Sequence, residues 1–318
     1  MKDGMSVLDR SARRSLAVED NETLWNLHQA LVTQMKKDGG NLGAKNELFE
    51  AKIELARGIM RSCRLCERRC GVNRLSGEKG FCGIGRTSYY FAESITYSEE
   101  LPIIPSYTIY LNGCNFRCAY CNTREDNSWL PNSGEEVQIE KLSREILSRK
   151  DEISNVNFLG GEPTPHLLTI IYIARKLNGE VPIVWDSNMY CSVETIKLLG
   201  GVIDIYLGDF RYGNDECAMR YSGIEDYSRI VKRNLLLAER SGRLIVRYLL
   251  LPGHFECCFL PVVEWLKENL PRVEFSLFSE YVPCSEGEGF EEIGKRISAE
   301  EIERAKNVVE EKGFALVS

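Results

Sequence analysis

Short apolar runs alternate with longer amphipathic segments over most of the chain beyond residue 105. The runs are rich in β-branched and aromatic residues, which is typical of strands, while the longer segments place apolar residues at helical spacing. Strict alternation of strand and helix predicts a parallel sheet joined by right-handed crossovers. The predicted strands are 107–111, 155–159, 181–185, 202–207, 244–251 and 273–278, and the predicted helices are 139–147, 167–177, 193–199, 225–240, 260–269 and 299–312.

This alternation predicts an α/β fold. An open, partial (β/α)6 barrel of the TIM type fits best, because such a barrel collects functional residues at the carboxyl ends of its strands. An open doubly wound sheet is the alternative.

Two segments precede the predicted barrel. Residues 1–57 are charged and carry apolar residues near helical spacing. Residues 58–104 are rich in cysteine and glycine, and they end in a strand or hairpin before the prolines at 102 and 105. We therefore expect four parts: an N-terminal helical extension (1–57), a cysteine-rich metal-binding segment with a hairpin (58–104), the partial barrel (105–290), and a C-terminal helix and strand (291–318).

Composition and charge narrow the class of protein. The 318 residues are 43% hydrophobic, which is enough for a sizeable core, and the net charge of −7 does not favour a nucleic-acid binder. No apolar run reaches the length of a membrane span, and the N-terminus has no apolar signal core. Twelve cysteines in such a chain indicate thiols bound to metal in the cytoplasm rather than disulfides.

One loop carries the strongest chemical signal. Asn112-Gly113 breaks the first predicted strand, and Cys114, Cys118 and Cys121 follow in the spacing C-x3-C-x2-C. Thiolates this close on one loop favour zinc or an iron–sulfur cluster, with incidental thiols as the alternative. Because the motif has three cysteines, a cubane cluster here would leave one iron open to a small molecule.

A second cysteine array precedes the barrel. Cys63, Cys66, Cys70 and Cys82 are spaced x2, x3 and x11 in a glycine-rich stretch that needs a metal to hold it together. Four thiolates can close a structural zinc site, which the short span suits, or hold a second cluster that relays electrons. Nearby arginines fit two alternatives: a solvent-exposed face, which is the usual case, or a surface that binds an acidic partner or RNA. They are Arg61, Arg64, Arg68, Arg69 and Arg74.

Glycines and polar residues follow the predicted strands, where a barrel places its site. After the second strand, Gly160-Gly161-Glu162 lets a ligand approach the backbone and offers a carboxylate to an ammonium group. Asn188 follows the third strand, as a ligand contact or a helix N-cap. Asp209 and Arg211 follow the fourth strand. Arg247 lies inside the fifth, where a charge needs a carboxylate partner or a functional reason.

Three side chains after the fifth strand each fit more than one role. His254 is either a proton donor to a substrate or an ordinary loop histidine. The nearby Cys257 and Cys258 are ligands, a thiyl intermediate or buried thiols. Cys191, Cys217 and Cys284 show no partner spacing and receive no role.

From Cys63 to about Cys284 the chain resembles the PflX-like group of the radical SAM superfamily, which is related to pyruvate formate-lyase activating enzyme. The resemblance is carried by CRLCERRCGVNRLSGEKGFCGIG, GCNFRCAYCN, GGEPTPHL, VWDSNMY and RYLLLPGHFECC. It implies a [4Fe-4S] cluster on Cys114, Cys118 and Cys121, with its free iron chelated by the amino and carboxylate groups of S-adenosylmethionine.

The resemblance also assigns roles around the cluster. Tyr120 matches the aromatic position that packs against adenine, and Gly160-Gly161-Glu162 matches the motif that binds the methionine amino group. Asp209 and Arg211 resemble the Asp-x-Lys element of activating enzymes, whose aspartate holds the ribose hydroxyls or amino group and whose cation holds the carboxylate. Arginine keeps the charge of lysine with a different geometry. The extra cysteines precede the radical motif, whereas the ferredoxin-like inserts of activating enzymes follow it.

These features imply a radical SAM oxidoreductase of the activating-enzyme type. An electron from the cluster cleaves S-adenosylmethionine, and the 5′-deoxyadenosyl radical abstracts hydrogen from a protein or a small molecule. A low-potential ferredoxin or flavodoxin is the expected electron donor, and no membrane partner is expected. The alternative is a non-catalytic iron–sulfur or zinc protein that carries electrons or scaffolds clusters.

Overall fold

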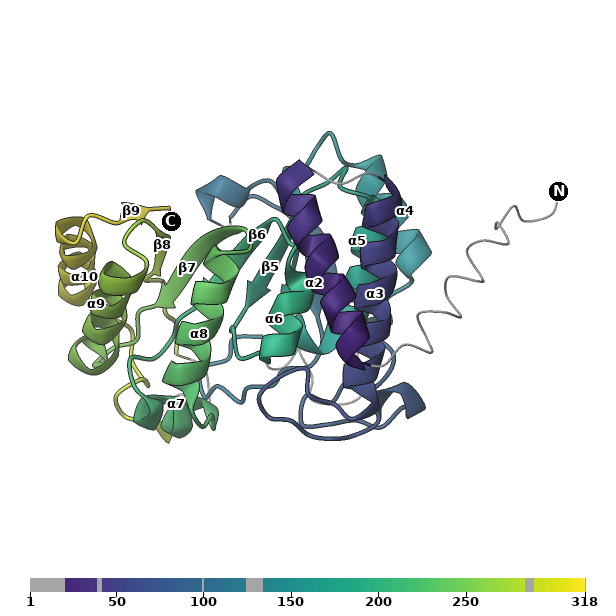
Figure 1. Cartoon of the computed structure of the whole chain (residues 1–318). Coiled ribbons are helices and arrows are strands. Elements are labelled where there is room, and N and C mark those ends of the chain that lie inside the picture. The colour runs from purple at the N-terminus through teal and green to yellow at the C-terminus, as the bar shows by residue number, and fades with distance from the viewer. Residues whose placement is uncertain (1–20, 39–41, 99, 124–133, 284–288, 318) are drawn as a thin grey trace.

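The computed structural model describes residues 21–38, 42–98, 100–123, 134–283 and 289–317, which are built around a nine-stranded sheet (Figure 1). The strand order is β3-β1-β2-β4-β5-β6-β7-β8-β9, so the sheet is open. Neighbouring strands are parallel from β2 to β9, while β1 pairs antiparallel with both β2 and β3. The strands are β1 Tyr89–Thr96, β2 Ser106–Leu111, β3 Glu135–Glu136, β4 Asn155–Gly160, β5 Ile183–Ser187, β6 Ile205–Asp209, β7 Arg243–Leu249, β8 Glu274–Phe278 and β9 Ala315–Leu316.

Helices follow most of these strands and cover the outer face of the sheet (Figure 1). Three of them have the bounds that the apolar spacing predicts, namely α5, α6 and α9. The α-helices are α2 Asn21–Asp38, α3 Leu42–Arg61, α4 Ile139–Ser148, α5 Leu167–Leu177, α6 Val193–Leu199, α7 Asp215–Ser222, α8 Tyr227–Glu239, α9 Leu260–Asn269 and α10 Ala299–Glu311, and a π-helical turn, η4, spans Phe255–Phe259.

The α/β partial barrel is confirmed, with β2 and β4 to β8 as its six predicted strands. Two strands, β5 and β6, begin two or more residues later than predicted. Residue 182 is a proline and has no N–H for the ladder, so β5 begins at Ile183. The amides of Val202 and Ile203 both donate to the carbonyl of Leu199 at 2.9 and 3.0 Å, which closes the end of α6 before β6 begins.

Helix α7 was not predicted from the sequence. Asn214 caps its first turn by accepting from the amide of Cys217, and Gly223 ends it in the left-handed conformation. Its eight residues mix acidic, basic and apolar side chains, so they show no clear apolar period.

The interior of the barrel has two layers because side chains alternate along each strand. Val184, Leu207 and Ile245 form an apolar layer with Ile103. Two residues further along the same strands stand the charged side chains Asp186, Asp209 and Arg247. This alternation places a polar layer at the carboxyl ends of the strands.

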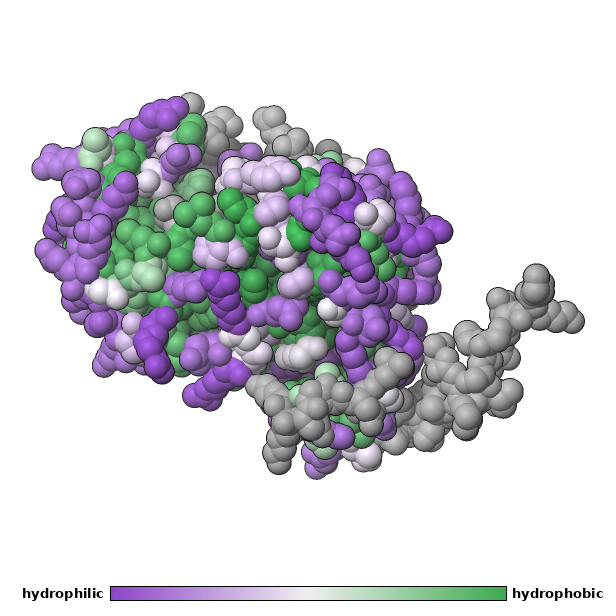
Figure 2. Space-filling view, turned by 90° about the horizontal axis from the view of Figure 1, so that it is seen from above, coloured by the Kyte–Doolittle hydropathy of each residue, from purple (hydrophilic) through white to green (hydrophobic). Residues whose placement is uncertain are grey.

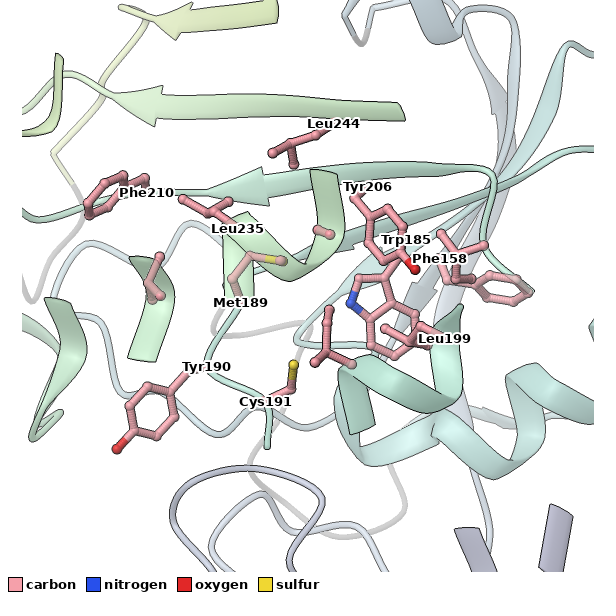
Figure 3. Close-up of a cluster of buried hydrophobic side chains, with 14 of the residues drawn as sticks. Phe158, Trp185, Met189, Tyr190, Cys191, Leu199, Tyr206, Phe210, Leu235 and Leu244 are labelled. Carbon is pink, nitrogen blue, oxygen red and sulfur yellow. The ribbon is translucent and has the colours of Figure 1, made fainter. Parts of the chain in front are cut away.

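The opposite face of the sheet packs against the helices (Figure 3). Trp185 and Tyr206 of neighbouring strands lie beside Leu199 of α6, and each has no exposed surface. Burial of large side chains on this face stabilises the sheet by roughly 1.5–3 kcal/mol for each aliphatic or aromatic group.

Surface hydropathy agrees with this layering. Figure 2 shows hydrophilic side chains around the periphery and apolar ones gathered towards the middle of that face. None of the helices in the described part of the chain combines the length and apolar character needed to span a membrane.

Lys52 of α3 links three helices and carries a pH-dependent part of the stability. Its buried amine donates to the carbonyls of Leu198 and Gly200 at the end of α6 and contacts Nε2 of His28 on α2 at 2.9 Å. Burial lowers the pKa of Lys52 to about 7.

We expect the wild-type free energy of unfolding, relative to a Lys52→Met variant, to rise as pH increases from about 7 towards 10. In that range the unfolded chain binds a proton at Lys52 that the folded chain does not. The free energy of unfolding gained at high pH is therefore lost as pH falls to the pKa of Lys52 in the folded chain. Urea unfolding at several pH values measures this difference. Lys45→Met, which removes an amine nearer the surface of the same helix, is the control, and equal pH profiles for the two variants would contradict the lowered pKa.

Candidate functional site

The predicted cysteine loop is held against the ends of two barrel strands. The amide of Gly161 donates to the carbonyl of Leu111 at 2.7 Å, and buried His166 contacts the carbonyl of Asn112 at 2.7 Å. Gly160 has φ +112°, and a Cβ there would overlap the backbone of Leu111. The glycine pair therefore lets the end of β4 fix the start of the loop.

The three loop thiols lie within electrostatic reach of one another. Burial raises the pKa of Cys114 well above its usual value, and the charges of Glu162, Cys118 and Cys121 raise it further. The three sulfurs nevertheless do not all lie within 4.8 Å of one another. One tetrahedral zinc would hold its sulfurs about 3.8 Å apart, given a Zn–S bond near 2.3 Å. A cubane does not require such close approach, because each thiolate binds a different iron.

Hydrogen-bond donors surround these sulfurs. Ser222 Oγ lies 3.0 Å from Cys118 Sγ and Arg211 Nη1 lies 3.7 Å from it, while the amide of Phe116 donates to Cys114 Sγ at 3.3 Å. Donors of this kind stabilise thiolates and tune the potential of a bound cluster.

Glu162 joins the glycine turn to the end of β5. One carboxylate oxygen accepts from the hydroxyls of Thr164 and Ser187 at 2.6 and 2.7 Å, and the other accepts from the amide of Asn188 at 3.0 Å. Burial raises its pKa, although these bonds oppose the shift. Oε2 has a single protein donor among the described residues, which leaves a lone pair for an ammonium group.

Asn188 is a positioning residue for the cysteine loop. Its Nδ2 donates to Asn115 Oδ1 at 2.7 Å and lies 4.0 Å from Cys114 Sγ. The helix that follows is capped by Ser192, whose hydroxyl accepts from the amide of Thr195. The N-cap alternative for Asn188 is therefore wrong.

Arg247 is the hub of the polar layer. Its guanidinium lies 2.6 Å from Asp186 Oδ1, 2.8 Å from Asp209 Oδ1 and 3.7 Å from Glu100 Oε1. The second oxygen of Asp209 contacts Arg211 at 2.5 Å. Burial alone would raise the pKa of Asp209, but the two arginines outweigh burial and hold that pKa below its usual value. Of the two roles open for Arg247, the structure supports that of a partner for barrel carboxylates.

Tyr120 is part of a buried hydroxyl chain. Its hydroxyl donates to that of Tyr212 at 2.6 Å, and Tyr212 in turn contacts Ser222 Oγ, also at 2.6 Å. Since Ser222 also donates to Cys118, the chain links the predicted adenine-side aromatic residue to a predicted cluster ligand. Sequence reasoning missed Tyr212 and Ser222, because the only signals were the caps of the unpredicted helix α7.

The second cysteine array adjoins the loop. All four of its cysteines line one small pocket that reaches Asn115 and Thr164 of the barrel side. A Cβ on Gly113 would lie 2.6 Å from the carbonyl of Cys82, so the two arrays meet at their backbones. Figure 1 places this dark-blue segment and α7 along the same side of the molecule.

Two arginines join the arrays, which gives them a structural role. Arg68 donates to the carbonyl of Asn115 at 2.5 Å, and Arg117 donates to the carbonyl of Phe81 at 2.6 Å. Both guanidinium groups stack on the ring of Phe81, at 3.6 and 4.0 Å from its centroid. Arg68 is therefore occupied within the fold rather than forming part of a purely solvated basic face.

The three residues with open roles after β7 lie in two different surroundings. His254 is buried, contacts the carbonyl of Pro252 at 2.9 Å and stacks edge-on against Tyr221. Cys257 is exposed, and it belongs with Cys258 and Cys217 to a separate group of thiols. Cys284 lies outside the described residues.

Replacing Arg247 with methionine is expected to lower the free energy of unfolding by about 3–5 kcal/mol, because three buried carboxylates would lose their shared partner. Chemical unfolding of the reconstituted protein measures the loss. Arg243→Met removes an arginine of the same strand whose ion pair with Glu274 is largely exposed, and it should cost about 1 kcal/mol or less. Equal losses for the two variants would contradict the central role of Arg247.

Comparison with known proteins agrees with this geometry. The chain is 36% identical to the uncharacterized protein MJ0674 of Methanocaldococcus jannaschii over 94% of its own length and 90% of that protein's. A stretch of 105 residues, 33% of this chain and 40% of the relative, is 26% identical to a Haemophilus influenzae protein named provisionally as a glycyl-radical enzyme activating enzyme.

The fold also matches that of Streptococcus suis SuiB bound to S-adenosylmethionine, with a TM-score of 0.50 and 15% identity. That match covers 64% of this chain and 47% of SuiB, so the chain spans less than half of that protein's length. The family model described as Radical SAM superfamily matches residues 108–266, from β2 to α9. The chain belongs to the radical SAM superfamily.

Proposed function

We propose that Cys114, Cys118 and Cys121 hold the [4Fe-4S] cluster of a radical SAM enzyme that cleaves S-adenosylmethionine reductively. The observation that carries the proposal is the set of hydrogen-bond donors around Cys114 and Cys118, beside the polar carboxyl ends of the barrel strands. The bound cluster would supply one electron to the sulfonium and thereby release a 5′-deoxyadenosyl radical.

The surrounding residues bind and orient the nucleotide. Glu162 offers Oε2 to the amino group, and Asn188 lies next to both Glu162 and Cys114. Arg211 stands beside Cys118, with Asp209 fixing its guanidinium, and it suits the methionine carboxylate. Tyr120 forms the wall of the site on the adenine side. Its ring is buried, and its hydroxyl is already hydrogen-bonded to Tyr212.

Beyond cleavage, we assign the chain to the PflX-like group and expect hydrogen abstraction from a protein or a small molecule. Its partial likeness to a protein named as an activating enzyme supports a protein substrate. A ferredoxin or flavodoxin in the cytoplasm is the proposed electron donor, since iron–sulfur clusters of low potential need such a partner.

A Cys118→Ala variant should lose S-adenosylmethionine cleavage by more than the roughly 10- to 100-fold that outer-shell changes cause, because a cluster ligand disappears. Protein reconstituted anaerobically with iron and sulfide is mixed with dithionite, and 5′-deoxyadenosine is quantified by mass spectrometry. Cys191→Ala, which removes a buried thiol outside both arrays, is the matched control. A cluster that forms in the wild type without any cleavage would instead favour an electron carrier or scaffold.

For the second array we propose a relay cluster on Cys63, Cys66, Cys70 and Cys82 rather than zinc. No three of these sulfurs lie within 4.8 Å of one another, which is wider than a zinc site requires. Buried Arg74 has one nitrogen with no hydrogen-bond partner among the described residues, and its charge lowers the pKa of Cys63 against the larger effect of burial. An anionic cluster would suit that guanidinium, and contact with the Cys114 loop suits electron transfer.

The relay proposal predicts about eight irons per reconstituted chain, and about four in a Cys66→Ala/Cys70→Ala variant. That variant should still cleave S-adenosylmethionine with dithionite, which reaches the radical cluster directly, but should lose cleavage driven by reduced flavodoxin. Metal analysis and 5′-deoxyadenosine assays with both reductants test this. About four irons in the wild type, instead of eight, would overturn the relay.

A further inference from the structure

A third group of thiols lies outside both arrays. Cys217 of α7 and Cys257 and Cys258 of η4 place their three sulfurs within 4.8 Å of one another. Among the described residues, this is the group of potential ligands that meets such a spacing. The sulfurs range from buried to exposed, so an ion could reach the group from solvent.

The local backbone is shaped to bring these thiols together. The carbonyl of His254 accepts from the amides of both Cys258 and Phe259 at 3.1 Å, which widens the helix into a π turn. Such turns occur often at functional sites. Gly213 packs against this turn, and a Cβ there would lie 2.6 Å from the carbonyl of Cys258. A larger residue at 213 would push η4 away from α7.

Asn214 connects all three cysteines. Its Oδ1 accepts from the amide of Cys217 at 2.8 Å, while its Nδ2 donates to the carbonyl of Cys257 at 2.8 Å. The same Nδ2 lies 3.7 Å from Cys258 Sγ. One side chain therefore holds the backbone of two ligands and offers a donor to the sulfur of the third, as outer-shell groups do at metal sites.

The spacing suits a single ion better than a cluster or a disulfide. A Zn–S bond near 2.3 Å sets sulfurs about 3.8 Å apart in a tetrahedral site, and Cys257 Sγ lies 3.8 Å from Cys258 Sγ.

A buried donor without a partner stands close to the group. Tyr248 of β7 has no exposed surface, and its hydroxyl has no hydrogen-bond partner among the described residues. Its ring packs against Phe259, which ends the same π turn as Cys257 and Cys258, with the two ring centroids 5.3 Å apart. Negative charge on the thiolates would attract the hydroxyl of Tyr248, which has no other partner among the described residues.

We infer that Cys217, Cys257 and Cys258 bind one Zn²⁺ ion, with a water molecule as the fourth ligand. Binding releases the three thiol protons to solvent and involves no oxidation. The described residues provide no fourth cysteine, histidine or carboxylate at this spacing, so one position stays exchangeable, as at catalytic zinc sites. Ser222 lies five residues beyond Cys217 on α7, about 7.5 Å along the helix, which places the ion on the radical-cluster side of the barrel.

Metal analysis of the anaerobically reconstituted full chain tests this site. The wild type should retain about one Zn²⁺ per chain after gel filtration, and the Cys217→Ser/Cys257→Ser/Cys258→Ser variant should lose it while its iron content stays the same. Cys191→Ser, at a buried thiol outside the group, should keep the zinc. Equal zinc in the wild type and the triple variant would overturn the inference.

A single exposed substitution covers the case in which the triple variant fails to fold. In Cys257→Ser, the affinity for Co²⁺ added in place of zinc should fall at least about tenfold, and the thiolate-to-cobalt absorption per ion should fall by about a third. Titration identical to the wild type, or mass spectrometry showing a disulfide among the three cysteines instead of bound metal, would overturn the inference. Neither readout depends on S-adenosylmethionine cleavage, so the site is tested separately from the proposed function.

Discussion

The ion pairs of Arg247 are the interaction on which the site depends. A guanidinium inside the barrel is costly unless it is paired, and here Asp186, Asp209 and Glu100 surround it. Asp209 and Arg247 are register partners on β6 and β7, so the parallel ladder itself fixes their distance. Asp209 forms an ion pair with Arg211 through its other oxygen. The same network therefore fixes the position of the Arg211 guanidinium beside Cys118.

Close backbone contacts then bring the loops onto this polar layer. Gly160 allows the end of β4 to approach Leu111, and Gly113 allows the cysteine-rich segment to approach the loop of Cys114, Cys118 and Cys121. At both positions a Cβ would collide with backbone atoms, and both have positive φ. The loops that carry seven thiols are therefore positioned by backbone contacts, while the charged network fixes the side chains between them.

The sequence predicted what is encoded over short distances. The alternation of strands and helices and the C-x3-C-x2-C loop are each contiguous, so spacing alone revealed them. The links through Tyr212 and Ser222 were missed because Tyr212 lies in the connection after β6, and Ser222 ends α7, a short helix marked only by its caps. The group of Cys217 with Cys257 and Cys258 was missed because only the packing of α7 on η4 brings these residues together.

Sulfur spacing, rather than cysteine count, distinguishes the three sites. The Cys114 loop has three thiols and the Cys217 group also has three, yet only the second brings its sulfurs within the reach of one ion. A cubane separates its thiolates over different irons, whereas zinc gathers them around one centre. Both sites leave one position without a protein ligand among the described residues, and α7 joins them through Ser222 and Cys217. Helix α7 is therefore the structural link between the proposed cluster site and the proposed zinc site.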